Sequence, residues 1–133
     1  MASKSKKILS EISAGELLDK LTILEIKLDK IENAEKKEIV NKEYLILKEA
    51  RDKHIAMDAS ISSLYKALKK TNLTLWDIED KIRIFEKEKN FGREFIELAR
   101  SVYINNDKRS KIKSEINTLL GSNIKEIKEY TDY

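Results

Sequence analysis

Leucine and isoleucine recur along most of the chain at the spacing of an α-helix. The first apolar stretch advances by alternating steps of four and three residues, a heptad seam made of Leu17, Leu21, Leu24, Leu28 and Ile31. Ser13 and Glu16 stand just before this seam in the arrangement of a capping box. We therefore expect a first helix that begins after Ser13 and ends near Asn33.

A second periodic stretch, residues 36–70, predicts an unusually long helix. Its apolar positions share one face: Ile39, Ile46, Ala50, Met57, Ile61, Leu64 and Leu68. A helix of this length would span about 50 Å, and such length is typical of a coiled-coil hairpin or an oligomer seam. We expect Thr71-Asn72 to end it and His54 to lie inside the seam, where it would fix the register. The alternative roles of His54 are a general base or a pH-sensitive contact.

Shorter helices are predicted in the second half of the chain. Residues 74–77 offer a cap for a third helix, and residues 90–92 (Asn-Phe-Gly) form a turn before a fourth. Residues 105–107 (Asn-Asn-Asp) are expected to end the fourth helix and to cap a fifth, which Gly121 ends. Residues 122–133 are expected to add one further helical turn.

These elements predict an all-α fold. The alternation that marks a β-strand never lasts beyond a few residues. A length of 133 residues suits one domain, so we expect a single helical domain over 1–133. Its architecture would be a helical bundle built around a long antiparallel coiled-coil hairpin, with three shorter C-terminal helices. Residues 1–12, with Lys4, Lys6 and Lys7, are expected to be a flexible or loosely docked basic N-terminus.

Composition narrows the function classes. The net charge is only +3 and the signs are interleaved, which makes a nucleic-acid partner unexpected. The chain has no Cys, one His and three isolated Gly, so we expect no thiolate, zinc, iron–sulfur or phosphate-loop chemistry, no cofactor, no metal and no assigned catalytic residue. No apolar run is long enough for a signal peptide or membrane span, so we expect a cytoplasmic protein. The excess of Lys, Ile and Asn suggests an AT-rich genome.

The predicted third helix carries one candidate site. Trp76, Asp80 and Arg83 follow an i, i+4, i+7 stripe beside its apolar face. Carboxylates near an Arg can hold a cation or a sugar, and a tryptophan face suits carbohydrate or cation stacking. The structural alternative is that Trp76 is a half-buried packing residue at the edge of the core.

A second candidate site lies where the predicted fourth and fifth helices meet. Cationic, aromatic and amide side chains gather there: Arg100, Tyr103, Asn105, Asn106 and Arg109. A helix N-terminus near Asp107 would expose backbone N–H groups to an anion, although the Asp107 carboxylate would compete for them. The structural alternative is that Arg100 only lays its aliphatic stem over the core.

The chain resembles a small family of functionally uncharacterised all-helical domains of bacteria and their phages. The resemblance covers nearly the whole chain and is carried by the blocks GELLDKLTILEIK (15–27), LWDIEDKIR (75–83) and FIELARSVYINNDKR (95–109), together with residues 112–122. It implies a free-standing helical domain and no assigned catalytic residue.

The sequence is therefore consistent with two candidate functions. The first is a non-enzymatic interaction or assembly protein, most simply a homodimer joined through the long second helix. The second is a small helical ligand-binding protein or enzyme that uses Arg, Lys and carboxylates on an anionic or sugar-type ligand. Lys20, Arg83, Arg100 and Arg109 would supply its cations, with Glu16 or Asp80 as proton acceptor. Convergence of Arg83, Arg100 and Tyr103 on one cleft would favour the second.

Overall fold

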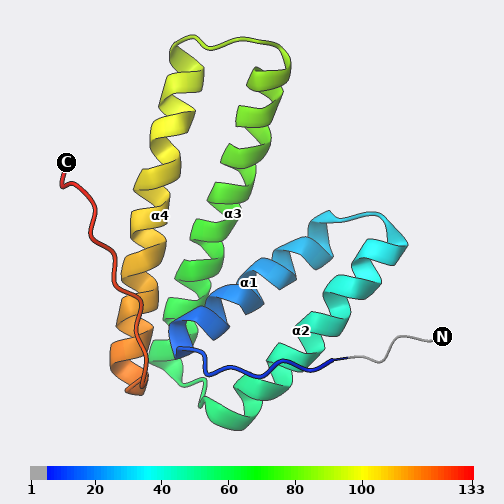
Figure 1. The fold of residues 1–133 in the computed structure, drawn as a ribbon, viewed down its shortest axis with the longest axis vertical. Coiled ribbons are helices and arrows are strands. Elements are labelled where there is room, and N and C mark those ends of the chain that lie inside the picture. Colours follow the sequence, from blue (N-terminus) through cyan, green and yellow to red (C-terminus); the bar gives the residue numbers. More distant parts are fainter. Residues whose placement is uncertain (1–5) are drawn as a thin grey trace.

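The computed structural model describes residues 6–133, and Lys4 of the basic N-terminus lies outside them. Four helices follow in chain order: α1 (Ala14–Lys30), α2 (Ala34–His54), α3 (Ala59–Lys87) and α4 (Arg93–Leu120). No strand occurs among the described residues, so the all-α prediction is confirmed. In Figure 1, α3 and α4 form a long antiparallel hairpin, and the shorter α1–α2 hairpin branches away from its lower half.

The N-cap of α1 is the predicted Ser13, but the Glu16 side chain pairs with Lys113 instead of completing the predicted capping box. The Ser13 side chain accepts a hydrogen bond from the backbone N–H of Glu16 at 3.2 Å. Asn33 has a different role from the one expected, because its side chain accepts from the N–H of Lys36 at 3.0 Å and caps α2. The first connection is therefore only a few residues long.

The prediction of a single long helix over residues 36–70 is wrong. The helix ends at His54, and Asp58 caps α3 by accepting from the N–H of Ile61 at 2.9 Å. An N-cap aspartate satisfies N–H groups that a continuous helix would bond internally, so it favours a new start at this point. His54 is exposed at the end of α2 and lies in no seam.

The break splits the predicted apolar face between two places. Ile61 and Leu68 are buried in the core with Leu17, Leu18, Leu21 and Ile116, so this half of the predicted seam is filled within the chain. The other half begins on α2, which has no buried residue among those described, and ends with Met57 in the connection to α3. The interpretation of residues 36–70 as one continuous oligomer seam is therefore wrong.

Thr71-Asn72 does not interrupt α3. The Thr71 hydroxyl donates to the carbonyl of Ala67 at 3.0 Å, a bond that a helical side chain can make. The Asn72 amide is buried and donates to Asp19 Oδ1 at 2.9 Å and to Thr22 Oγ1 at 2.8 Å. Asparagine breaks helices by bonding to nearby backbone, and here partners on α1 occupy it instead.

The predicted stop at residues 105–107 is also wrong, because α4 runs without interruption from Arg93 to Leu120. Asn105 donates to the carbonyl of Ser101 at 2.8 Å, and Asp107 accepts from the hydroxyl of Tyr133. The expected three shorter C-terminal helices are therefore replaced by the α3–α4 hairpin. The turn at residues 90–92 and the end at Gly121, whose φ is +60°, are confirmed.

Residues 122–133 run in non-helical conformation beside α4 (Figure 1), so the expected extra helical turn is wrong. Two contacts hold this tail on α4. Glu126 accepts from Lys113 Nζ at 3.0 Å, and the ring of Tyr133 lies edge-on to that of Tyr103 with 5.2 Å between the ring centroids. Its start also meets the N-terminal segment, since Asn123 donates to Glu11 at 2.8 Å.

Helix α1 is the centre of the fold and packs against the other three helices. Its first turn touches α4 directly, because Gly15 donates its N–H to Asn117 Oδ1 at 2.7 Å. A Cβ at Gly15 would lie 2.6 Å from the carbonyl oxygen of Lys113, so only glycine allows this approach. The close contact brings the next turn of α1, with Asp19, against the middle of α4.

Candidate ligand-binding site

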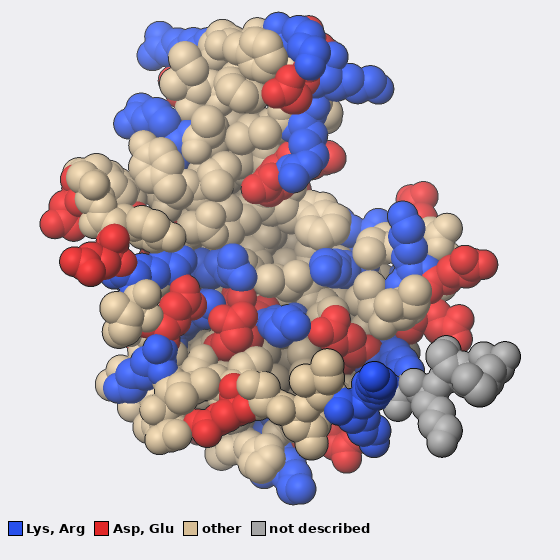
Figure 2. Space-filling view, in the orientation of Figure 1, with Lys and Arg blue, Asp and Glu red and all other residues tan. Residues whose placement is uncertain are grey.

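A groove of about 550 Å³ lies where α1 crosses the α3–α4 hairpin. Such a volume is in the range of small-molecule sites. Figure 2 shows the molecule hollowed between the upper part of this hairpin and the α1–α2 hairpin. Three helices line the groove, with Ile23 and Ile26 from α1, Asn72, Leu75, Trp76, Glu79, Asp80 and Arg83 from α3, and Asn106 and Arg109 from α4.

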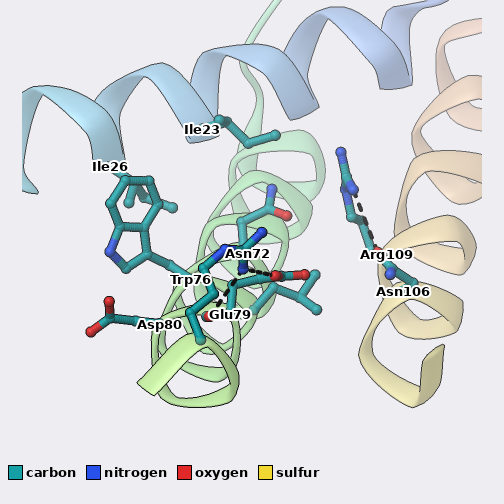
Figure 3. Close-up of a pocket in the computed structure, with 10 residues that line it drawn as sticks. Ile23, Ile26, Asn72, Trp76, Glu79, Asp80, Asn106 and Arg109 are labelled. Carbon is teal, nitrogen blue, oxygen red and sulfur yellow. Dashed lines mark hydrogen bonds and ion pairs between the residues drawn. The ribbon is translucent and has the colours of Figure 1, made fainter. Parts of the chain in front are cut away.

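The groove unites members of both predicted candidate sites. Trp76, Asp80 and Arg83 reach it from α3, and Asn106 and Arg109 reach it from α4. They meet because α4 is one continuous helix antiparallel to α3, which places its middle opposite the middle of α3. In Figure 3, Trp76 and Arg109 lie on opposite sides of Asn72.

Three predicted candidates do not line the groove. Arg100 is exposed, Tyr103 packs on Tyr133, and Asn105 bonds within its own helix. The convergence of Arg83, Arg100 and Tyr103 on one cleft, which would favour ligand binding, does not occur, because only Arg83 of the three lines the groove. The expected anion site at a helix start near Asp107 is also wrong, because Asp107 lies inside α4.

A buried polar cluster, formed by Asp19, Thr22, Asn72 and Arg109, supports one end of the groove. The Asp19 side chain is 1% exposed, and both of its oxygens accept from Arg109 on α4: Oδ1 from Nε at 2.8 Å, and Oδ2 from Nη2. Asn72 of α3 donates to Asp19 Oδ1 and Thr22 Oγ1. The Thr22 hydroxyl donates to the carbonyl of Asp19 at 2.7 Å. The cluster ties α1, α3 and α4 together.

Sequence reasoning missed Asp19, Thr22 and Asn72. The heptad seam covers only one stripe of α1, whereas Leu18 and Ile26 are also buried and Thr22 lies between them at helical spacing. A helix with apolar residues on more than one face is expected to be buried on several sides. A charged residue such as Asp19 inside such a helix needs a buried partner. This requirement is the sequence signal that could have identified Asp19 as part of a buried polar cluster.

Arg109 is positively charged and does not use all of its N–H groups in hydrogen bonds within the protein. The hydrogen bond to the Asp19 carboxylate raises the pKa of Arg109 above its ordinary value, against the lowering effect of burial. Two of its N–H groups point to Asp19, and a third, on Nη1, reaches Asn106 Oδ1 at the long distance of 3.5 Å. A guanidinium carries five N–H groups, so two of them are left without a partner among residues 6–133.

The rim carries a second ion pair. Arg83 donates through Nη1 to the backbone carbonyl of Glu79 at 3.0 Å and to its carboxylate. This pair is solvent-exposed, so it contributes little to stability. Asp80 forms no ion pair within residues 6–133 and is the only lining carboxylate there without one.

The other residues considered for an anion site lie elsewhere. Glu16 accepts from Lys113 Nζ at 2.7 Å, and Lys20 pairs with Glu43 at 3.2 Å. Neither Glu16 nor Lys20 lines the groove. Across residues 6–133 no three His, Cys, Asp or Glu side chains gather as metal ligands, and none of the described helices is long and apolar enough to cross a membrane.

Comparison with known proteins shows which family the chain is related to. No curated protein and no solved structure matches the chain. A model of the family of unknown function DUF6165 matches residues 8–132, which is nearly the whole chain. The predicted resemblance to an uncharacterised family is thereby confirmed, and the chain belongs to the DUF6165 family.

Proposed function

We propose that the protein binds a small uncharged polyhydroxyl molecule, a sugar-type ligand, in the groove between α1, α3 and α4. The observation that carries this proposal is the composition of the lining. Trp76 and polar side chains line the same groove, and its two cations, Arg83 and Arg109, are each paired with a carboxylate. Of the two functions considered from the sequence, the ligand-binding one is supported better by this geometry.

Hydrogen bonding favours a hydroxyl-bearing ligand. Asn72 uses its amide N–H groups on Asp19 and Thr22, while none of residues 6–133 donates to its Oδ1. That oxygen is an acceptor in a groove-lining residue, and Arg109 supplies donors from the same groove. A hydroxyl group donates and accepts at once, so it can satisfy both.

The apolar part of the lining favours a ring with a hydrophobic face. Ile23, Ile26, Leu75 and Trp76 provide most of the apolar wall, and Trp76 is only partly buried. A flat aromatic side chain buries much area at little cost in conformational entropy, and it packs well against the C–H face of a sugar ring.

The charges favour an uncharged ligand over an anionic one. Arg83 is paired with Glu79 and Arg109 with Asp19, so each cation of the lining already has a carboxylate. Asp80 adds a further negative charge at the rim. An anion would therefore meet net repulsion, whereas hydroxyl groups can use every one of these side chains as partners.

The single tryptophan of the chain provides the test. Trp76 emission is expected to change saturably when a binding monosaccharide is added. Asp80→Asn is expected to weaken this binding at least about tenfold, because a hydrogen bond to a charged acceptor contributes roughly 1.5–3 kcal/mol. Asp77→Asn is the matched control, because Asp77 lies on the same helix, is exposed and does not line the groove.

Two outcomes contradict the proposal. One is that no member of a panel of common monosaccharides changes the emission of Trp76. The other is that Asp80→Asn and Asp77→Asn have equal effects on binding, since the signal would then come from outside the groove.

Assembly is the second candidate function, and the surface of α2 favours it. Ile39, Leu45 and Ile46 are each more than half exposed on a helix that buries none of its described residues. A second copy covering this surface would remove apolar area from water. The mass in solution tests this: a multiple of 15.5 kDa supports assembly, and a single 15.5 kDa species at high concentration contradicts it.

A further inference from the structure

We infer that Asp19 sets the charge selectivity of the groove: by pairing with Arg109 it excludes free anions and leaves the guanidinium as a hydrogen-bond donor to an uncharged ligand. This inference rests on the proposed function of the groove and adds the residue that determines its specificity. Asp19 does not line the groove, so it acts through Arg109 as a positioning residue.

The geometry of the pair gives Asp19 this role. Its carboxylate occupies one edge of the guanidinium, the edge formed by Nε and Nη2, in a two-point contact. Asn72 donates to the same carboxylate from α3, so three hydrogen bonds hold Asp19 in place. Its side chain is 1% exposed, and that of Arg109 is 28% exposed. The carboxylate is therefore fixed, and part of the Arg109 side chain stays accessible.

The pair changes what Arg109 can bind. A free guanidinium attracts oxyanions through both its charge and its paired N–H groups. With Asp19 bound along one edge, an oxyanion on the opposite edge would lie only a few Å from a second negative charge. The attraction and the repulsion then largely cancel, while the N–H groups can still donate to a neutral oxygen.

The surrounding charges act in the same direction. Glu79 and Asp80 line the groove, and Glu16 and Glu126 both raise the pKa of Arg109 through their charges. Lys113 lies between Glu16 and Glu126 and pairs with both. Arg83 is bound to Glu79. Lys113 and Arg83 are therefore both paired with carboxylates. Neither of them adds a free positive charge that could attract an anion to Arg109.

The test compares inorganic phosphate with chloride at equal ionic strength for the wild type, Asp19→Asn and Glu79→Gln. The Asp19→Asn substitution keeps the shape of the side chain and removes its charge. Phosphate stabilises most proteins generally, so the wild type sets that baseline. Glu79→Gln is the matched control, because it frees the other arginine of the groove, which is exposed on the rim.

Asp19→Asn is expected to bind phosphate at least about tenfold more tightly than the wild type, since removing one charge a few Å from the bound anion exceeds the ~1.4 kcal/mol that corresponds to tenfold. The NMR signal of Arg109 Nε–H should shift with phosphate in this variant alone. Its thermal midpoint should also rise more with phosphate than that of the wild type or of Glu79→Gln, because a ligand of the folded state stabilises it.

If Asp19→Asn is poorly folded, phosphate should restore its helical circular dichroism more than that of Arg109→Ala, which also breaks the buried pair but lacks the guanidinium. Equal phosphate effects in all three proteins, or a phosphate-induced shift at Arg109 in the wild type, would overturn the inference. Its failure is distinct from that of the proposed function. Monosaccharide binding without gained phosphate binding removes only the role of Asp19, and the reverse result removes only the sugar-type ligand.

Discussion

Replacing Arg109 with alanine is expected to reduce the free energy of unfolding by about 3–5 kcal/mol, the usual cost of removing one partner from a buried ion pair. The Asp19 carboxylate, which is 1% exposed, would lose two of its three donors. Urea unfolding followed by circular dichroism measures the change as a lower midpoint with little change in slope.

Arg83→Ala is the matched control for this variant. Arg83 also forms an ion pair with a carboxylate beside the groove, but its side chain is 71% exposed. Exposed pairs of this kind contribute roughly 0–1 kcal/mol, so the midpoint should hardly move. Equal losses in the two variants would show that Asp19 is not buried with Arg109 as its main partner.

Ile61→Asp is expected to unfold the protein or to destabilise it by more than about 4 kcal/mol. Ile61 is 1% exposed and packs in the core near the start of α3, so the new carboxylate would be buried among apolar side chains. The helical circular dichroism at room temperature should fall, and any remaining unfolding transition should move to a lower temperature.

Ile39→Asp makes the same chemical change on α2, where Ile39 is 71% exposed. It should leave the fold intact, because the carboxylate stays in water. A stable Ile61→Asp variant would contradict the burial of Ile61 in the core. Loss of a higher-mass species in Ile39→Asp would instead support the assembly candidate.

The helical class and several boundaries could be predicted from the sequence because local chemistry determines them. Ser13 caps α1 through its own side chain, and Gly121 ends α4 in the left-handed conformation. The turn at residues 90–92 separates α3 from α4 in the expected place. Each of these signals acts within a few residues of chain, so no tertiary contact is needed to interpret it.

The errors arise where distant partners override a local signal. The local sequence predicts that Asn72 ends a helix, but its amide bonds to Asp19 and Thr22 on another helix. The stop signal at residues 105–107 fails only partly in this way: Asp107 bonds to Tyr133 of the tail, but Asn105 bonds to a carbonyl of its own helix. The opposite error occurs at Asp58, whose cap is hidden by the continuing apolar period on both sides of it.

The site shows the same limits. Trp76, Asp80 and Arg83 can be grouped from the sequence because they lie on one helix at helical spacing, and all three line the groove. Their convergence with Asn106 and Arg109 depends on how α4 packs on α3, which a single sequence does not reveal. Asp19 is missed because its partner, Arg109, is 90 residues away in the chain.

Binding of an uncharged polyhydroxyl ligand in the groove should change the side chains that line it. The most direct measurement is an NMR titration that follows the side-chain N–H signals of Trp76, Asn72 and Arg109 together. We expect a binding monosaccharide to shift all three signals along one saturation curve, while inorganic phosphate leaves that of Arg109 unchanged. Signals that stay unmoved by every monosaccharide of the panel, or a shift of Arg109 with phosphate in the wild type, would contradict the account.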